Sequence, residues 1–165
     1  MKIQVGGLSQ GSHSYSFQVE PREIGLDERF TGTVDVTVEL EKTPTQVELM
    51  GRASAEGRFA CDRCAEEFTQ ALKGSWRMHY LWNETEAAQW DPSEVQIVPP
   101  TLAVIDLGED VRQTLILAVP LKLLCRPECK GLCPQCGTNL NQATCNCSSE
   151  PGDSRWDALR ALRSN

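Results

Sequence analysis

The sequence contains only two histidines, His13 and His79, and none of the common catalytic motifs that use histidine. There is no H-E-x-x-H pattern, no Ser/His/Asp constellation and no glycine-rich loop of the kind that holds phosphate. Asp106, Glu109 and Asp110 lie close together, but capping of a helix explains them better than a pair of catalytic carboxylates does. We therefore expect a protein that is not an enzyme, with both histidines as ordinary surface or strand residues.

Long apolar runs are also missing. A membrane-spanning helix needs roughly 18 apolar residues, and the longest run, near residues 115–119, is far shorter. The N-terminal residues lack the apolar core and the cleavage site of a secretory signal peptide. We therefore expect no membrane association and a cytoplasmic location. The plastid stroma is the alternative if the source is a photosynthetic eukaryote and a transit peptide has been removed.

Positive charge is scarce, because 16 Lys and Arg stand against 23 Asp and Glu. The imbalance lies in residues 1–110, with 9 basic and 19 acidic residues, whereas residues 111–165 carry 7 and 4. Affinity for phosphate depends on Lys and Arg that release counterions, so a basic protein partner suits this chain better than non-specific nucleic-acid binding. The best basic cluster comprises Lys122, Arg126, Lys130, Arg155, Arg160 and Arg163. It is a candidate contact for phosphates or an acidic surface, and a solvated face explains it equally well.

Cysteine, by contrast, is abundant. The eight cysteines are Cys61, Cys64, Cys125, Cys129, Cys133, Cys136, Cys145 and Cys147. Thiols of the cytosol are kept reduced, so metal ligation is a better explanation than disulfides. Two C-x-x-C pairs, together with C-x-x-x-C and C-x-C, predict zinc sites in which four thiolates leave no open position for catalysis. We therefore expect one or two structural zinc ions, with an iron–sulfur cluster as the less favoured cofactor.

The spacing leaves the pairing of the cysteines open. The simplest partition groups Cys133, Cys136, Cys145 and Cys147 around one zinc and the other four around a second. A different partition joins the Cys61 pair to the pair Cys133 and Cys136, and a single zinc with spare thiols is a third possibility.

Hydrophobic patterning predicts an α+β fold with a β-rich core. Alternation of apolar and polar residues predicts antiparallel strands at 30–41, 45–60 and 68–82, with the first cysteine pair at a hairpin tip. The acidic segment 83–94 is expected to be a loop. The segment 105–120 predicts one central helix, with Asp106 and Glu109 as a capping box and Pro120 at its end. Residues 153–164 predict a closing amphipathic helix.

The predicted organisation has three parts. Residues 1–124 form a β-rich core domain with the central helix, 125–147 a Cys-rich zinc module, and 148–165 a linker and the C-terminal helix.

Four blocks of the chain, in order, resemble the YceD family of large ribosomal RNA subunit accumulation proteins. The blocks are FACDRCAEEF (59–68), IDLGEDVRQTLILAVPLKLLC (105–125), CKGLCPQCGTNLNQATCNC (129–147) and RWDALRAL (155–162). Some members of that family lack most of the third block. This implies that the zinc module is an accessory and that Cys61, Cys64, Cys125 and Cys129 form the older site.

The resemblance implies a non-catalytic factor that promotes accumulation of 23S rRNA, through its synthesis, processing or stability, during ribosome biogenesis. The implied partners are a ribosomal protein or large-subunit assembly factor, with precursor rRNA as a further contact. We hypothesise that the acidic N-terminal half binds a basic ribosomal protein while the C-terminal basic residues orient the chain on precursor rRNA. The alternatives are a general zinc-ribbon adaptor between proteins, without a ribosomal role, and a redox or metal-handling protein.

Overall fold

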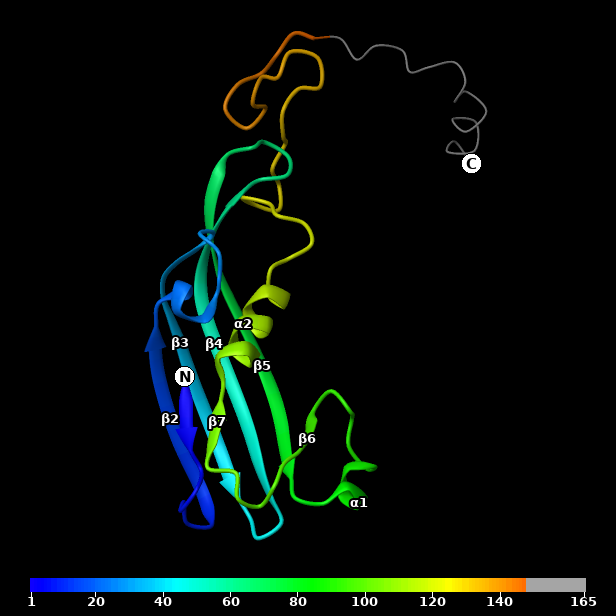
Figure 1. Ribbon diagram of the computed structural model, residues 1–165. Helices are drawn as coiled ribbons and strands as arrows, with labels where there is room; N and C mark the ends of the chain where they lie inside the picture. The colour runs from blue at the N-terminus through cyan, green and yellow to red at the C-terminus, as the bar shows by residue number, and fades with distance from the viewer. Residues whose placement is uncertain (148–165) are drawn as a thin grey trace, which may run out of the picture.

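The computed structural model describes residues 1–147, in which strands predominate over helices. Its largest element is a twisted five-stranded sheet with the order β2-β3-β4-β5-β6 (Figure 1). The strands are β2 (Gly11–Val19), β3 (Phe30–Lys42), β4 (Gln46–Ala60), β5 (Glu67–Leu81) and β6 (Val95–Ile97). The first four pair antiparallel, and β6 runs parallel to the last three residues of β5. The fold is therefore mixed α+β.

Each long strand buries every second side chain on one face of the sheet, as period-two alternation requires. In β3 the buried row is Val34, Val36, Val38 and Leu40, each at most 1% exposed. The residues between them carry polar or charged side chains that are exposed. One face of the sheet is thus apolar and covered, while much of the other is polar and open.

The apolar face is covered by α2 (Gly108–Leu117) and by a small second sheet. That sheet pairs β1 (Lys2–Gln4) with β7 (Val104–Asp106), which places the N-terminus beside the start of the helix (Figure 1). Val111 and Leu115 of α2 are fully buried in the core. A Cβ at Gly74 would lie 2.5 Å from Thr114 Cγ2, so glycine there allows the helix to approach β5 closely.

The strands predicted at 30–41, 45–60 and 68–82 are confirmed to within one residue. The helix is shorter than predicted, because residues 104–106 form β7 and the helical residues are Gly108–Leu117. The capping box is wrong. Asp106 pairs with Lys2 across the small sheet and accepts a hydrogen bond from the Gly108 N–H (3.0 Å), while Glu109 accepts from Arg112 and Gln113.

Besides β7, five other elements were not predicted: β1, β2, β6, a 3-10 helix and a short α-helix. β2 lies in the serine-rich stretch to which no strand was assigned, and η1 (Pro21–Ile24) follows it. The acidic segment 83–94 contains a short helix, α1 (Glu84–Ala87), where only a loop was expected. Nearby, His79 is fully buried in β5 and stacks on Trp90 at 3.7 Å between ring centroids, so it is a strand histidine and not a surface one.

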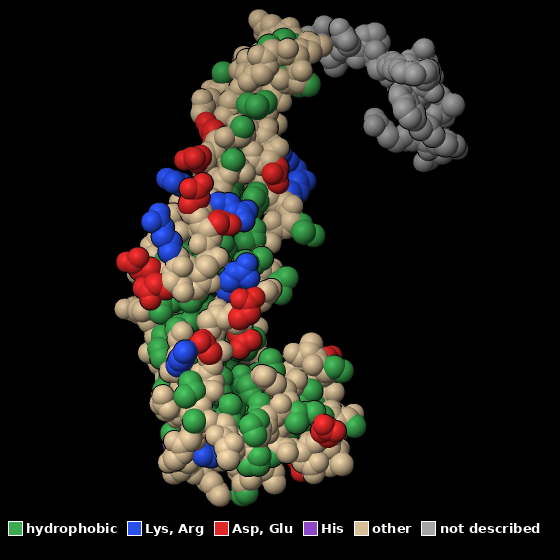
Figure 2. Space-filling view, in the orientation of Figure 1, with side chains coloured by type: hydrophobic (Ala, Val, Ile, Leu, Met, Phe, Trp, Pro, Cys, Tyr) green, Lys and Arg blue, Asp and Glu red, His purple; other side chains and the backbone are tan. Residues whose placement is uncertain are grey.

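The expected linker, the C-terminal helix and the residues Arg155, Arg160 and Arg163 lie outside the described residues. Within residues 1–147, no helix is long and apolar enough to cross a membrane. Figure 2 shows acidic and basic side chains intermixed over the middle of the face that carries α2. Residues 118–124 lead from that helix towards the tip of the β4–β5 hairpin, and the Cys-rich segment 125–147 continues beyond the tip (Figure 1).

Candidate metal centre

The loop between β4 and β5 holds the first cysteine pair. Ala60 and Glu67 are the last paired residues of the hairpin, and Cys61 and Cys64 lie between them. The turn is closed by two backbone hydrogen bonds, Cys61 N–H to Glu66 O (2.9 Å) and Ala65 N–H to Cys61 O (2.8 Å). Ala65 adopts a left-handed conformation (φ 60°), which completes the tight turn after the second cysteine. Both thiols therefore point to the same side of the hairpin tip.

The two residues between these cysteines attach the later segment of the chain to the hairpin. Asp62 pairs with Leu123 twice, through its N–H to Leu123 O (2.8 Å) and through Oδ2, which accepts from the Leu123 N–H (2.7 Å). The guanidinium of Arg63 donates to Cys129 O (2.7 Å). These contacts bring the pair Cys125 and Cys129 opposite the hairpin cysteines.

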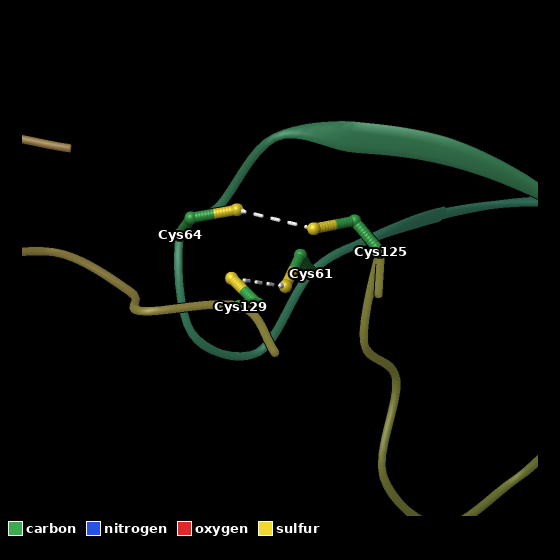
Figure 3. Close-up of side chains that lie close together, drawn as sticks. All are labelled: Cys61, Cys64, Cys125 and Cys129. Atoms are coloured by element: carbon green, nitrogen blue, oxygen red, sulfur yellow. Dashed lines mark hydrogen bonds between the residues drawn. The ribbon is translucent and has the colours of Figure 1, made fainter. Parts of the chain in front are cut away.

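The four thiols of this first group face one another (Figure 3). Sγ of Cys61 lies 3.8 Å from Sγ of Cys129, and Sγ of Cys64 lies 3.7 Å from Sγ of Cys125. Four thiolates at Zn–S distances of 2.3 Å in a tetrahedron stand about 3.8 Å apart. All four Sγ atoms lie within 4.8 Å of one another, and three of the four residues are buried. The arrangement fits one tetrahedral metal ion.

The remaining cysteines form a second group with the same Sγ spacing limit of 4.8 Å, comprising Cys133, Cys136, Cys145 and Cys147. Its first pair lies on a knuckle in which the Cys133 N–H donates to Thr138 O (2.8 Å) and the Gly137 N–H donates to Cys133 O (2.9 Å). Gly137 has φ 72°, a conformation that favours glycine. Cys136 and Cys147 are exposed, so the second group is more open to solvent than the first.

Hydrogen bonds connect the two groups. The side-chain amide of Asn141 donates to Sγ of Cys129 (3.3 Å), and its Oδ1 accepts from the Lys130 N–H (2.9 Å). The Leu132 N–H donates to Arg63 O (3.0 Å), and Gln142 donates to the carboxylate of Glu66. The second group is thereby held against the loop that carries the first.

Comparison with known protein families shows to which family this chain belongs. The family model described as large ribosomal RNA subunit accumulation protein YceD matches residues 49–163, a span that includes both cysteine groups. The chain belongs to the YceD family.

Relatives of this YceD-family chain occur in plants and bacteria. The chloroplastic large ribosomal RNA subunit accumulation protein YCED homolog 1 of Arabidopsis thaliana is 35% identical over 65 residues, 39% of this chain and 20% of the relative. The homolog of the same name in Zea mays is 26% identical, with 73% of this chain and 53% of the relative covered. An uncharacterized protein of Mycobacterium tuberculosis is 26% identical, with coverage of 76% and 60%. The chain thus spans between a fifth and three fifths of these relatives, and no solved structure matches it.

Local hydrogen bonds and burial give the thiols of the first group different pKa values. The backbone N–H of Cys125 is the main cause that lowers the pKa of Cys61 to about 6. Burial raises the pKa of Cys129, but the Asn141 amide and the Gly131 N–H outweigh this effect and the net pKa is lowered. Burial raises the pKa of Cys125 to about 12. Because the thiolate is the metal ligand, the hydrogen bonds that favour thiolates at Cys61 and Cys129 also favour metal binding by the group.

The thiols of the second group also differ in pKa. A hydrogen bond with the hydroxyl of Thr138 (3.1 Å) is the largest cause that lowers the pKa of Cys136 to about 6. The backbone N–H of Cys136 lowers the pKa of Cys133, whereas the neighbouring Cys136 thiol raises that of Cys147 to about 12. Each group therefore contains one C-x-x-C thiol with a strongly lowered pKa.

The structure separates the eight predicted ligands into the two groups of the simplest partition that the spacing left open. Lys122, Arg126 and Lys130 are exposed near the first group and make no ion pair within the described residues. Sequence reasoning missed Asp62, Arg63 and Asn141 as supporting residues. Their positions between or beside cysteines could have identified them, because polar side chains there lie close enough to form hydrogen bonds with the loops that carry the cysteines.

Proposed function

We propose that this chain is a non-catalytic zinc-binding factor that promotes accumulation of 23S rRNA during ribosome biogenesis. The description of its family names accumulation of the large ribosomal RNA subunit, and this is the process that we propose for the chain. The observation that carries the rest of the proposal is the pair of four-thiol groups at the hairpin tip. Their all-cysteine composition favours a structural role, since four protein ligands leave no coordination position for a substrate.

Zinc is the ion that the thiol geometry supports best. Soft thiolate ligands in a tetrahedron favour zinc over magnesium or calcium, which prefer oxygen ligands. Sulfur separations of 3.7 and 3.8 Å suit four ligands on one ion. The thiolates of an iron–sulfur cluster are distributed over two or four iron atoms, so they do not all lie within 4.8 Å of one another as these do. A zinc in the first group would fasten residues 125–129 to the hairpin, and one in the second would hold residues 133–147 together.

This attachment suggests how the chain could work in ribosome assembly. The zinc-stabilised end of the molecule would present Lys122, Arg126 and Lys130, which are exposed and free of ion pairs in the described part, to precursor rRNA or an assembly factor. The rest of the molecule carries most of the negative charge and suits a basic ribosomal protein. The chain would then act by bringing two components together, with no chemical step.

The test is the ratio of large to small ribosomal subunits on a sucrose gradient after depletion of the protein. We expect a selective fall in large subunits, with precursor large-subunit rRNA accumulating or degrading, and recovery when the wild-type chain is supplied. A Cys61→Ser/Cys64→Ser chain should fail to restore the ratio, while an Asn83→Ala chain, changed only at the cap of α1, should restore it. An unchanged ratio in rich medium and under growth stress would contradict the ribosomal role and indicate a general protein adaptor.

A further inference from the structure

The outer edge of β2 differs from the other long edge of the sheet. β2 is the terminal strand of the sheet and has no partner on its outer side within the described residues. Its nine residues include no Asp, Glu, Lys or Arg. The edge of β5, by contrast, carries exposed Lys73 and Arg77. Charged side chains on an edge discourage pairing with another chain, so β2 is the edge left free to accept a strand.

Small side chains on β2 expose a row of carboxylates on β3. On the open face of the sheet, Ser12 lies beside Glu41 and Ser14 beside Glu39. A hollow of about 290 Å³ lies over this region and is lined by Ser12, Ser14, Glu39, Glu41 and Glu48, among others. Serine is too short to cover the carboxylates, so they are accessible from the side of the edge.

The chain's own cations form only weak ion pairs, or none, with Glu39 and Glu41. Glu39 pairs with Arg52 at 3.4 Å, and both side chains are more than half exposed. Glu41 has no ion pair among the described residues. Exposed pairs of this kind contribute little and are easily exchanged for a better-placed cation.

On the other face of β2, aromatic side chains offer apolar contact. Tyr15 and Phe17 are half-buried and stack on each other, with centroids 6.4 Å apart and planes 13° from parallel. Successive residues of an added strand would point alternately to the serine face and to this aromatic face. The matching segment therefore alternates basic residues with apolar ones.

We propose that β2 accepts an extended segment of a basic protein partner, in which Lys or Arg alternates with apolar residues and the basic side chains reach over Ser12 and Ser14 to Glu39 and Glu41. Such a strand would lie about 4.8 Å from β2 and about 10 Å from β3. A long basic side chain and a glutamate can together span that distance. The proposal rests on the proposed function for the ribosomal setting of the partner and adds the surface and the partner's chemistry.

A second copy of the chain is a poorer occupant of the same edge. Pairing two β2 strands would bring two rows of Glu39 and Glu41 toward each other in a chain whose formal charge is already −7. Like charges across a paired edge are unfavourable. A basic partner instead gains both the backbone hydrogen bonds of an added strand and opposite charge.

The experiment measures binding of a fluorescently labelled nine-residue peptide of alternating lysine and valine to the zinc-loaded full chain. We expect salt-sensitive binding, with amide chemical-shift changes centred on Gly11–Val19. Glu39→Gln/Glu41→Gln should weaken binding by about tenfold, because two favourable charge contacts are lost. The matched double variant Glu56→Gln/Glu67→Gln removes two exposed carboxylates of the same face, away from Ser12 and Ser14, and should bind like the wild-type chain.

A further probe separates strand addition from attraction between charges. A peptide methylated at alternate backbone nitrogens keeps its charges but cannot complete the hydrogen-bond ladder, and it should bind far more weakly. Equal binding of the two peptides, or equal weakening by the control double variant, would overturn the proposal. The proposal would also be overturned if the peptide fails to bind and the chain sediments as a dimer that Ser14→Lys dissociates.

The same variant distinguishes this proposal from the proposed function. If depletion lowers the large-subunit ratio but Glu39→Gln/Glu41→Gln restores it fully, the ribosomal role stands and the role of the β2 edge is wrong. If depletion changes nothing while the peptide binds as expected, the surface stands and the ribosomal role is wrong.

Discussion

Asn141 is the residue through which the second cysteine group reaches a ligand atom of the first. Its amide donates to Sγ of Cys129, and its Oδ1 fixes the backbone N–H of Lys130. Hydrogen bonds to a coordinating sulfur stabilise its charge and orient it. Outer contacts of this type typically change metal affinity by about 10–100-fold.

We therefore predict that Asn141→Ala weakens metal binding by the first group by about tenfold or more. Competition with a chromophoric zinc chelator would measure this, with release from the two groups resolved by their rates. Asn83→Ala is the matched control, because Asn83 caps α1 at a distance from both groups and should leave metal affinity unchanged. Equal affinity in the Asn141 and Asn83 variants would show that the bond to Cys129 contributes nothing.

The long strands could be predicted from the sequence because their signal is local. From Val34 to Leu40, every second residue of β3 is a valine or leucine, and the residues between are polar. β2 was missed because Ser12, Ser14 and Ser16 resemble a flexible stretch, although Tyr15, Phe17 and Val19 alternate with polar residues as a strand requires. β1 and β7 could not be found, since three-residue strands paired between the two ends of the domain have no local pattern.

The cysteine ligands were likewise visible in the sequence, whereas their grouping was not. Loops of these lengths can close in more than one way at similar entropic cost, so spacing alone cannot choose a partition. The choice depends on contacts between distant residues, chiefly Asp62 with Leu123 and Arg63 with Cys129. Such contacts are consequences of the fold and become visible only in three dimensions.

The packing of β4 against β5 depends on a glycine at one crossing. Gly51 pairs with Trp76, and a Cβ at Gly51 would lie 2.2 Å from Cζ2 of the indole. The indole ring therefore lies across the backbone of β4, in space that a side chain would occupy.

Gly51→Ala should destabilise the chain by about 1–3 kcal/mol, because the ring must move out of a packed position. Gly108→Ala is the matched substitution at the start of α2, where the nearest atom to a new Cβ is Asp106 Oδ1 at 3.4 Å. It should stabilise the chain by about 0.5 kcal/mol, because alanine loses less backbone entropy than glycine in a helix. Urea unfolding followed by circular dichroism would measure both. A similar loss in the two variants would mean that the indole does not restrict position 51.

At the scale of the whole molecule, the candidate metal centre and the hydrophobic core are separate. The core contains buried residues from the main sheet, the small β1–β7 sheet and α2, while Cys61, Cys64 and Cys129 form a second buried cluster at the hairpin tip. The Cys-rich end adds few apolar residues of its own to this cluster. Small units of this kind depend on a metal for their order, whereas the sheet has a core of its own.

Removal of metal with a chelator should therefore loosen residues 123–147 and leave the sheet folded. We expect hydrogen exchange at the N–H groups of Leu123, Leu132 and Cys133 to accelerate strongly, since their acceptors lie in or beside the metal-held loops. The far-ultraviolet dichroism of the sheet should persist.

The second group should release its metal first, because Cys136 and Cys147 are exposed while three ligands of the first group are buried. A Cys145→Ser/Cys147→Ser chain should lack the fast phase and keep the slow one. Loss of the sheet together with the metal, or a single release phase in the wild-type chain, would show that the two ends form one cooperative unit.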